Sequence, residues 1–499
     1  MKPFYAHEDV GSQGDCRLLV ISYFFPPDAA VGARRWEKLC HYAAERGWGV
    51  DVITRSAPEL LPTHPRLREL PSGVRVYSVA APEPAVARVL KKTEERVSKL
   101  VRERKISRSV ASTARGSVPG QFQTLPSSIA RADVRWALGT PRGLLRLYWT
   151  FLDYTGGSAW SSAAVEAAAA IFRRGVHRAV VATSPPYLVQ EGARQIGRRW
   201  GIPFVLDMRD PWSHVERLIE AAATPLWLHL AARYESRAVA EAALVIANTE
   251  LARRQLVATY PRRASDIITV TNGADEESLP PQRVGGRFVI AHAGTLYLDR
   301  DPRALFVAAG RVIREFGLTP GEFGLSFIGE LEAVGGFPIH EVARQEGISE
   351  YVETGPPLPH AAALAFMSQA TMLVTMSGTN MAAVPAKTFE CIRFPAWVLA
   401  LSAPGSATEL LLEGTEADVV APSDADGIAA AIRGRYLAHR GGAIPAPIGE
   451  SQPRFSRRFQ ANVLFDALDA RVGCRTRDPQ LAVAPAQQPR SVQRRQVAS

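Results

Sequence analysis

The chain has 499 residues, of which 46% are apolar and 22% charged, a composition that excludes an intrinsically disordered or membrane-embedded protein and predicts two or three domains. Its formal charge of +10 is concentrated: residues 88–115 hold ten Lys and Arg against three Glu, and residues 475–499 hold five Arg against one Asp. The remaining chain is close to neutral, so the main body is not expected to bind nucleic acid.

Chain-wide features also predict where the protein works. No apolar run reaches the roughly 20 residues that a membrane-spanning helix needs, and the polar first residues hold no secretory signal. We therefore expect a cytoplasmic protein. The four cysteines, Cys16, Cys40, Cys391 and Cys474, lie far apart without a C-x-x-C pair, which favours reduced, packed thiols over a disulfide framework or a zinc site.

The first half of the chain alternates apolar strands with helical segments. A helix is predicted from Gly32 to Arg46, directly after the first strand. The predicted strands are residues 16–24, 49–54, 177–184, 203–208, 243–249 and 267–273. Continuous apolar strands separated by helices are typical of a parallel sheet that is covered on both faces.

The same pattern restarts after a linker, residues 275–286, that is rich in Pro, Gly and charge. The second set of predicted strands is residues 287–295, 324–329, 351–355, 370–377, 396–401 and 417–422. We therefore expect a first domain over residues 1–283 and a second over 284–452. Doubly wound domains bind ligands at the carboxyl ends of their strands, so the crevice between the domains is the expected site.

An insertion at about residues 85–150 interrupts the first domain. Its first part, to about residue 110, has the spacing of a basic amphipathic helix, and aromatic residues alternate with Arg over residues 131–149. An anionic membrane surface, bound through residues 88–115, or a lipid-linked acceptor would suit this pattern. A solvated helix that covers the first domain is the alternative.

The most informative segment is VPAKTFECI, residues 384–392, preceded by the small, polar loop 377–380. Pro385 suits the first turn of a helix, whose free N–H groups could bind a phosphate. Lys387 and Glu390 share one helix face, with a cation for a diphosphate and a carboxylate for the hydroxyls of a ribose. A solvated ion pair is the commoner meaning of this spacing.

This segment closely resembles the PAK-x-x-E segment of family 4 type glycosyltransferases. Other segments resemble the same family in the same order: VISYFFPPDAAVGARRW (20–36), TSPPY (183–187), LDMRDPW (206–212), ITVTNGADEE (268–277) and AHAGTLYLDRDPRAL (291–305). The resemblance covers residues 16–470. It implies a GT-B fold, in which two Rossmann-like α/β domains face each other across a cleft. A C-terminal helix, residues 453–472, is then expected to cross back to the first domain, ahead of a disordered basic tail, 473–499.

The resemblance assigns the donor side of the cleft. Glu390 would hold the donor ribose, and Arg300, after Gly294 and Thr295, would clamp the diphosphate and with Lys387 stabilise the leaving group. Gly32 would let backbone approach the phosphates, or is a plain loop glycine.

The acceptor side is assigned from the first domain. Arg209 and Asp210 follow a strand and either orient the acceptor, with Asp210 as a further catalytic candidate, or pair with each other. Asp28 occupies the loop where inverting GT-B enzymes keep their base, and is merely a loop carboxylate if configuration is retained.

One position departs from the family. Its first glutamate, separated from the second by seven residues, is replaced by Ala382. The scattered histidines form no metal-binding pattern, so His292 and His360 are expected to be structural and transfer to need no metal. Neither a dinucleotide-binding glycine motif nor a P-loop is present, and no cofactor is expected.

These features predict a retaining hexosyltransferase that moves sugar from a nucleotide diphosphate sugar to the hydroxyl of a lipid-linked or saccharide acceptor. The expected pathway is cell-surface polysaccharide or glycolipid synthesis, with the protein peripheral on the inner face of the plasma membrane. A nucleotide-sugar epimerase of the same fold is one alternative, although Ala382 argues against it. A catalytically inactive nucleotide-sugar-binding or scaffold protein is the other.

Overall fold

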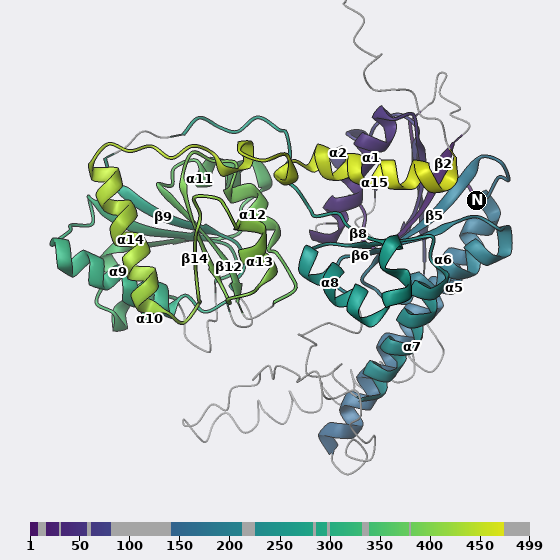
Figure 1. Cartoon of the computed structure of the whole chain (residues 1–499), viewed down its shortest axis with the longest axis horizontal. Helices are drawn as coiled ribbons and strands as arrows, with labels where there is room; N and C mark the ends of the chain where they lie inside the picture. Colours follow the sequence, from purple (N-terminus) through teal and green to yellow (C-terminus); the bar gives the residue numbers. More distant parts are fainter. Residues whose placement is uncertain are drawn as a thin grey trace, which may run out of the picture.

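The computed structural model describes residues 1–7, 16–28, 31–56, 61–80, 141–211, 225–282, 286–296, 300–331, 339–378 and 381–473. These residues form two α/β lobes, each built on its own sheet (Figure 1). The predicted basic helix at 85–110 and the tail from 474 onward lie outside the described residues.

The first sheet has eight strands in the order β1-β4-β3-β2-β5-β6-β7-β8. Its strands are β1 (Tyr5–Ala6), β2 (Arg17–Ser22), β3 (Gly49–Arg55), β4 (Val74–Val79), β5 (His177–Ser184), β6 (Phe204–Met208), β7 (Leu244–Ala247) and β8 (Ile267–Thr269). All neighbours pair in parallel except β1, which runs antiparallel to β4. The carboxyl ends of seven strands therefore meet at one edge.

Helices cover both faces of this sheet, as continuous apolar strands require. One face packs on α1 (Val31–Glu45), with Trp36 and Leu39 in the core. The other packs on α5 (Pro141–Ile171), α6 (Val189–Trp200), α7 (Pro225–Glu241) and α8 (Glu250–Thr259). A short helix, α2 (Pro65–Arg68), precedes β4.

The second sheet is parallel throughout, in the order β11-β10-β9-β12-β13-β14. Its strands are β9 (Phe288–Ala293), β10 (Phe323–Ile328), β11 (Val352–Gly355), β12 (Met372–Gly378), β13 (Trp397–Ser402) and β14 (Asp418–Val420). One face is covered by α9 (Arg303–Phe316), α10 (Ile339–Gln345) and α14 (Ala425–Arg440). The other is covered by α11 (His360–Met367), α12 (Ala386–Cys391) and α13 (Ala407–Leu412).

The last helix, α15 (Arg457–Val472), crosses back to the first lobe, where Figure 1 draws it beside α1. Leu464, Phe465 and Leu468 enter the core between α1 and the first sheet. Two doubly wound lobes and a returning C-terminal helix confirm the predicted fold class.

Several details differ from the prediction. Strand β4 was not predicted, because its burial does not follow one simple period: Arg75 and Ser78 are only partly buried among buried neighbours. The insertion ends in α5, a helix of 31 residues, from which Trp160 packs on the sheet. Cys40 and Cys391 are free and buried as expected, but Cys16 is disulfide-bonded, so the expectation of reduced thiols is wrong there.

Candidate active site

The carboxyl ends of the two sheets meet along a seam between the lobes. Helix α1 begins on this seam, and Arg34 in its first turn reaches His360, the first residue of α11. Thr249, at the start of α8, donates a hydrogen bond of 2.7 Å from Oγ1 to the carbonyl of Ala382. Ala382, at the position that departs from the resembled family, thus joins the two lobes through its backbone carbonyl.

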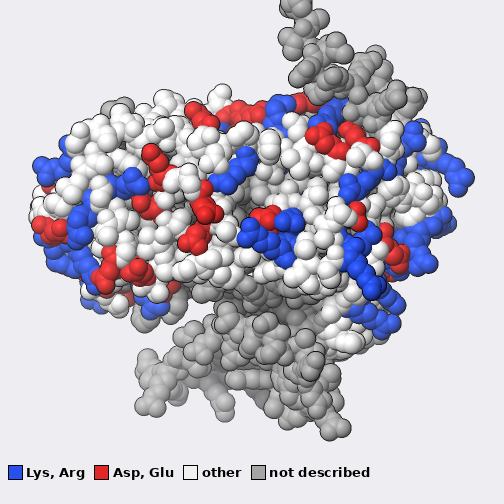
Figure 2. Space-filling view, in the orientation of Figure 1, with Lys and Arg blue, Asp and Glu red and all other residues white. Residues whose placement is uncertain are grey.

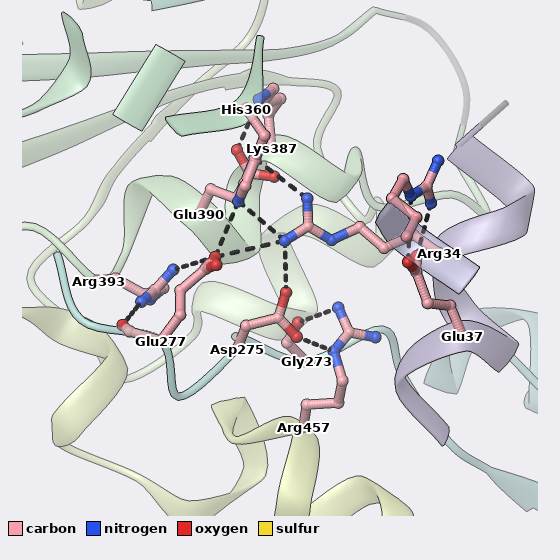
Figure 3. Close-up of polar contacts among 11 residues, drawn as sticks. Arg34, Glu37, Gly273, Asp275, Glu277, His360, Lys387, Glu390, Arg393 and Arg457 are labelled. Carbon is pink, nitrogen blue, oxygen red and sulfur yellow. Dashed lines mark hydrogen bonds and ion pairs between the residues drawn. The ribbon is translucent and has the colours of Figure 1, made fainter. Parts of the chain in front are cut away.

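Lys387 and Glu390 lie on α12 and face this seam (Figure 3). Lys387 Nζ donates to Glu390 Oε2 at 2.6 Å, and the side chains are 34% and 17% exposed. Without a ligand the two predicted donor residues neutralise each other. Because α12 has only six residues, its dipole is small, and side-chain cations must supply most of the positive charge for a diphosphate.

Two glycine-containing turns meet at the ends of β9 and β10. Gly329 has a φ of +137°, and a Cβ there would lie 2.0 Å from the carbonyl oxygen of Gly294. The backbone of Gly294 can therefore lie directly against that of Gly329. Gly294 and Thr295, both partly buried, start this loop, and Arg300 follows it.

His292 lies on β9 just below this loop. Its Nδ1–H donates to the carbonyl of Val374 at 2.9 Å, and Nε2 has no hydrogen-bond partner among the described residues. A Cβ on Gly294 would lie 3.1 Å from Nε2. Burial, with smaller effects of Arg300 and Lys387, lowers the pKa of His292 to about 4. The neutral ring lies near both cations that the sequence assigned to the diphosphate.

Arg34 crosses the seam and ends among acidic side chains (Figure 3). Its Nη2 donates to Asp275 Oδ2 at 2.7 Å and to Glu277 Oε1 at 3.3 Å, both in the linker that follows β8. Although burial opposes it, the charges of Arg457 and Arg34 lower the pKa of Asp275 to about 2. The hydrogen bond from His360 is the main cause that lowers the pKa of Glu277 to about 2.

Gly32, the second residue of α1, makes room for an arginine. A Cβ at this position would lie 2.1 Å from Arg209 Nη1. Arg209 Nε donates to the carbonyl of Ser184 at 2.9 Å and Nη2 to that of Pro185 at 3.3 Å. The missing side chain thus admits a guanidinium, a reason for the glycine that the sequence did not suggest.

Asp28 and Asp210, the two carboxylates predicted for the acceptor side, have different surroundings. Arg209 binds backbone carbonyls, and no ion pair joins it to Asp210, although both residues are described. Asp210 is exposed by accessible area, yet enough protein surrounds its carboxyl group to raise the pKa, against a smaller lowering effect of Arg209. A cleft carboxylate can combine both properties. Asp28 pairs with Arg55 at 2.6 Å, as a structural loop carboxylate would.

The residues that hold the seam together were not among the predicted site residues. Arg34, Asp275 and Glu277 lie inside quoted motifs but were assigned no role, and His360 was expected to be only structural. The signal was present in the linker, where three consecutive acids, Asp275, Glu276 and Glu277, depart from the neutral surroundings.

The described part of the chain carries charges of both signs on its surface. On the face in view in Figure 2, basic and acidic residues are interspersed over both lobes. Among the described residues no group of three His, Cys, Asp or Glu side chains could hold a metal ion. Across the same residues, no helix is both long and apolar enough to span a bilayer.

Known structures resemble the whole chain in its fold. Sucrose-phosphate synthase from Thermosynechococcus elongatus superposes with a TM-score of 0.55 at 14% identity, over 92% of this chain and 97% of that one. HepE from Anabaena in complex with UDP-glucose gives 0.54 at 12%, over 91% and 99%. The lipopolysaccharide outer core galactosyltransferase WaaB gives 0.51 at 12%, over 91% and 99%. The chain has the GT-B fold.

At these identities the similarity establishes the fold alone. The sequence matches no protein-family model and no curated protein. Membership of the family 4 branch therefore remains a prediction that rests on the motifs.

Proposed function

We propose that this GT-B protein is a glycosyltransferase that uses a nucleotide diphosphate sugar. The observation that carries the proposal is the Lys387 and Glu390 pair on α12, which faces α1 across the seam with Arg300 on the neighbouring loop. Of the structures with the same fold, WaaB is named a galactosyltransferase and HepE was solved with UDP-glucose, which favours a nucleotide-sugar donor.

Each residue would act on the donor in a defined way. Glu390 would accept hydrogen bonds from the ribose hydroxyls, and Lys387, released from Glu390, would turn to the diphosphate. Arg300 would hold phosphate oxygens and stabilise the charge on the departing nucleoside diphosphate. The backbone of Gly294 and Thr295 would line the same site.

The first lobe would bind the acceptor. Asp210, exposed after β6, is the proposed group that contacts the acceptor hydroxyl, and Arg209 holds the preceding loop in place through Ser184 and Pro185. The hydroxyl oxygen would form the new bond to the anomeric carbon as the bond to the diphosphate breaks, and the hydroxyl proton would pass to the departing phosphate oxygen. Retention of configuration and independence of metal ions follow from the family resemblance.

The proposed setting is the assembly of cell-surface polysaccharide or glycolipid at the cytoplasmic face of a membrane. The ten basic residues of 88–115 motivate this setting, because a polybasic segment is attracted to anionic lipid. Deletion of that segment is expected to reduce binding to anionic liposomes.

The proposal is tested by calorimetric titration of UDP and a panel of other nucleoside diphosphates. Glu390→Ala should weaken binding of the preferred nucleotide about tenfold or more, because the buried hydrogen bonds to the ribose are lost. Glu191→Ala is the matched control: Glu191 pairs with Arg194 at the same i,i+3 spacing, is 16% exposed and lies away from the seam.

Unchanged affinity in Glu390→Ala would refute the donor-site assignment. Incubation of the matching nucleotide-sugar without acceptor separates the alternatives, because an epimerase would isomerise the sugar and a transferase would not.

A further inference from the structure

The linker between the lobes carries three consecutive acids, which together bind basic groups from three parts of the molecule. Asp275 binds Arg34 of α1 and Arg457 of α15. Glu276 binds Arg458 of α15. Glu277 binds Arg34, His360 of α11 and Arg393, which follows α12. The first lobe, the second lobe and the returning helix thus meet on one short segment (Figure 3).

Arg34 is the member of this cluster that joins the two walls of the cleft. It belongs to the first turn of α1, two residues after Gly32, and its guanidinium contacts His360 of the second lobe. Its charge also acts on Glu390, the proposed ribose carboxylate. The side chain is 27% exposed and the Asp275 carboxylate 8%, so the pair is partly shielded from solvent.

His360 lies between Arg34 and Glu277. Its Nδ1 is 3.1 Å from Arg34 Nη1, and its Nε2 is 2.9 Å both from Arg34 Nη2 and from Glu277 Oε1. The Arg34 guanidinium therefore lies against the first residue of α11, and the Glu277 carboxylate pairs with both groups.

We propose that Arg34 is a positioning residue that closes the cleft, by fixing α1 to the linker acids and, through His360, to the donor-side lobe. Its consequence for catalysis rests on the proposed glycosyltransferase function, since it places the donor-binding α12 opposite the first lobe. The closure itself requires no substrate and can be measured without any.

The experiment measures the distance between spin labels on the full-length chain. The labels are placed at Arg198→Cys in the first lobe and Ile444→Cys in the second, positions that are 67% and 72% exposed. At pH 8 Arg34→Gln should lengthen and broaden the distance distribution by several ångströms. Arg435→Gln is the matched control, since Arg435 is 26% exposed and pairs with Asp418 inside the second lobe.

His360→Ala supplies a second measurement. It removes the contact between Arg34 and the second lobe, whereas the ion pair of Arg34 with Asp275 stays in place. This variant should also lengthen and broaden the distance distribution at pH 8. Should Arg34→Gln fail to fold, the comparison of the parent with His360→Ala carries the test alone.

The outcomes separate this proposal from the proposed function. An unchanged distribution in folded Arg34→Gln, or in His360→Ala, would overturn the role of Arg34. Opening in Arg34→Gln supports it even if no nucleotide binds, a result that would refute only the glycosyltransferase assignment. If transfer is observed, Arg34→Gln should lower kcat on the order of 10- to 100-fold, because the two substrates are misplaced relative to each other.

Discussion

His292 links the donor side of the cleft to the acid stability of the second lobe. The ring is 5% exposed, and its pKa is lowered to about 4 mainly by burial. In the unfolded chain a histidine takes up its proton near pH 6.5. Between these two values the unfolded chain binds more protons than the folded one, so stability must fall as the pH falls.

We therefore expect the free energy of unfolding to drop by up to about 3 kcal/mol from pH 6.5 to pH 4 through this residue. Replacing it, as His292→Asn, should remove that part of the pH dependence, since an asparagine amide can still donate to the carbonyl of Val374. Urea unfolding at a series of pH values measures the effect. Identical slopes in the two proteins would contradict it.

Gly32 gives a second prediction at the residue scale. Gly32→Ala should displace the Arg209 guanidinium and cost its bonds to Ser184 and Pro185, about 1 to 3 kcal/mol, against a gain of about 1 kcal/mol in helix propensity. In an Arg209→Ala background the loss disappears and the same change should stabilise. Urea unfolding of the four proteins tests this reversal, and an equal effect in both backgrounds would rule it out.

At the scale of elements, α15 is part of the first lobe although it ends the described chain. Leu464, Phe465 and Leu468 are fully buried or nearly so, together with Trp36 of α1. Ser456 caps the helix by accepting from the N–H of Phe459, and Arg46 pairs with Asp466 across to α1. Apolar burial, rather than these partly exposed contacts, supplies most of the stability of the interface.

Phe465→Ala should therefore destabilise the first lobe by about 3 to 5 kcal/mol, the usual cost of emptying a phenylalanine site in a core. Phe459 provides the control on the same helix, because it is 42% exposed and Phe459→Ala should cost under about 1 kcal/mol. Denaturation followed by tryptophan fluorescence would compare them. Equal losses in the two variants would show that α15 does not act as a core helix.

The elements that could be predicted from the sequence are those with a strong apolar period. The inner strands of both sheets were mostly found as apolar runs, whereas β1 has only two residues at the edge of its sheet and β4, next to it, carries mixed burial. Pro385 marked α12, and the spacing of Lys387 and Glu390 placed them on one face.

Contacts between elements far apart in sequence were out of reach. The partners of Gly32 and Arg34 lie 177 and 241 or more residues away, at Arg209 and Asp275, and no local period records such distances. The resemblance predicts donor-side residues because its motifs are local in sequence. It does not predict the ion pairs of the seam, because these depend on how the two lobes are placed.

At the scale of the whole molecule, charged pairs join the first lobe to the linker at the seam. Arg34 pairs with Asp275 and Glu277, and these partly exposed pairs are screened by salt. The hydrogen bond from Thr249 to Ala382 is neutral and does not depend on salt. Ionic strength should therefore loosen the closed form without abolishing it.

With the spin-labelled protein at pH 8, raising NaCl from 0.05 to about 1 M should broaden the distance distribution toward that of Arg34→Gln, because the Debye length shortens from over 10 Å to about 3 Å. Salt should change the Arg34→Gln variant much less. An equal response of the two proteins would mean that other contacts set the closure.

The chain crosses between the lobes twice, and the two crossings are joined. Ala274, on the outward path, receives a hydrogen bond from the N–H of Arg457 at 2.9 Å on the return path and forms a bridge with Ser456. Because the two crossings are hydrogen-bonded at one place, we expect the lobes to bend about that place and to resist twisting. Opening and closing would then bring the same side chains back into contact.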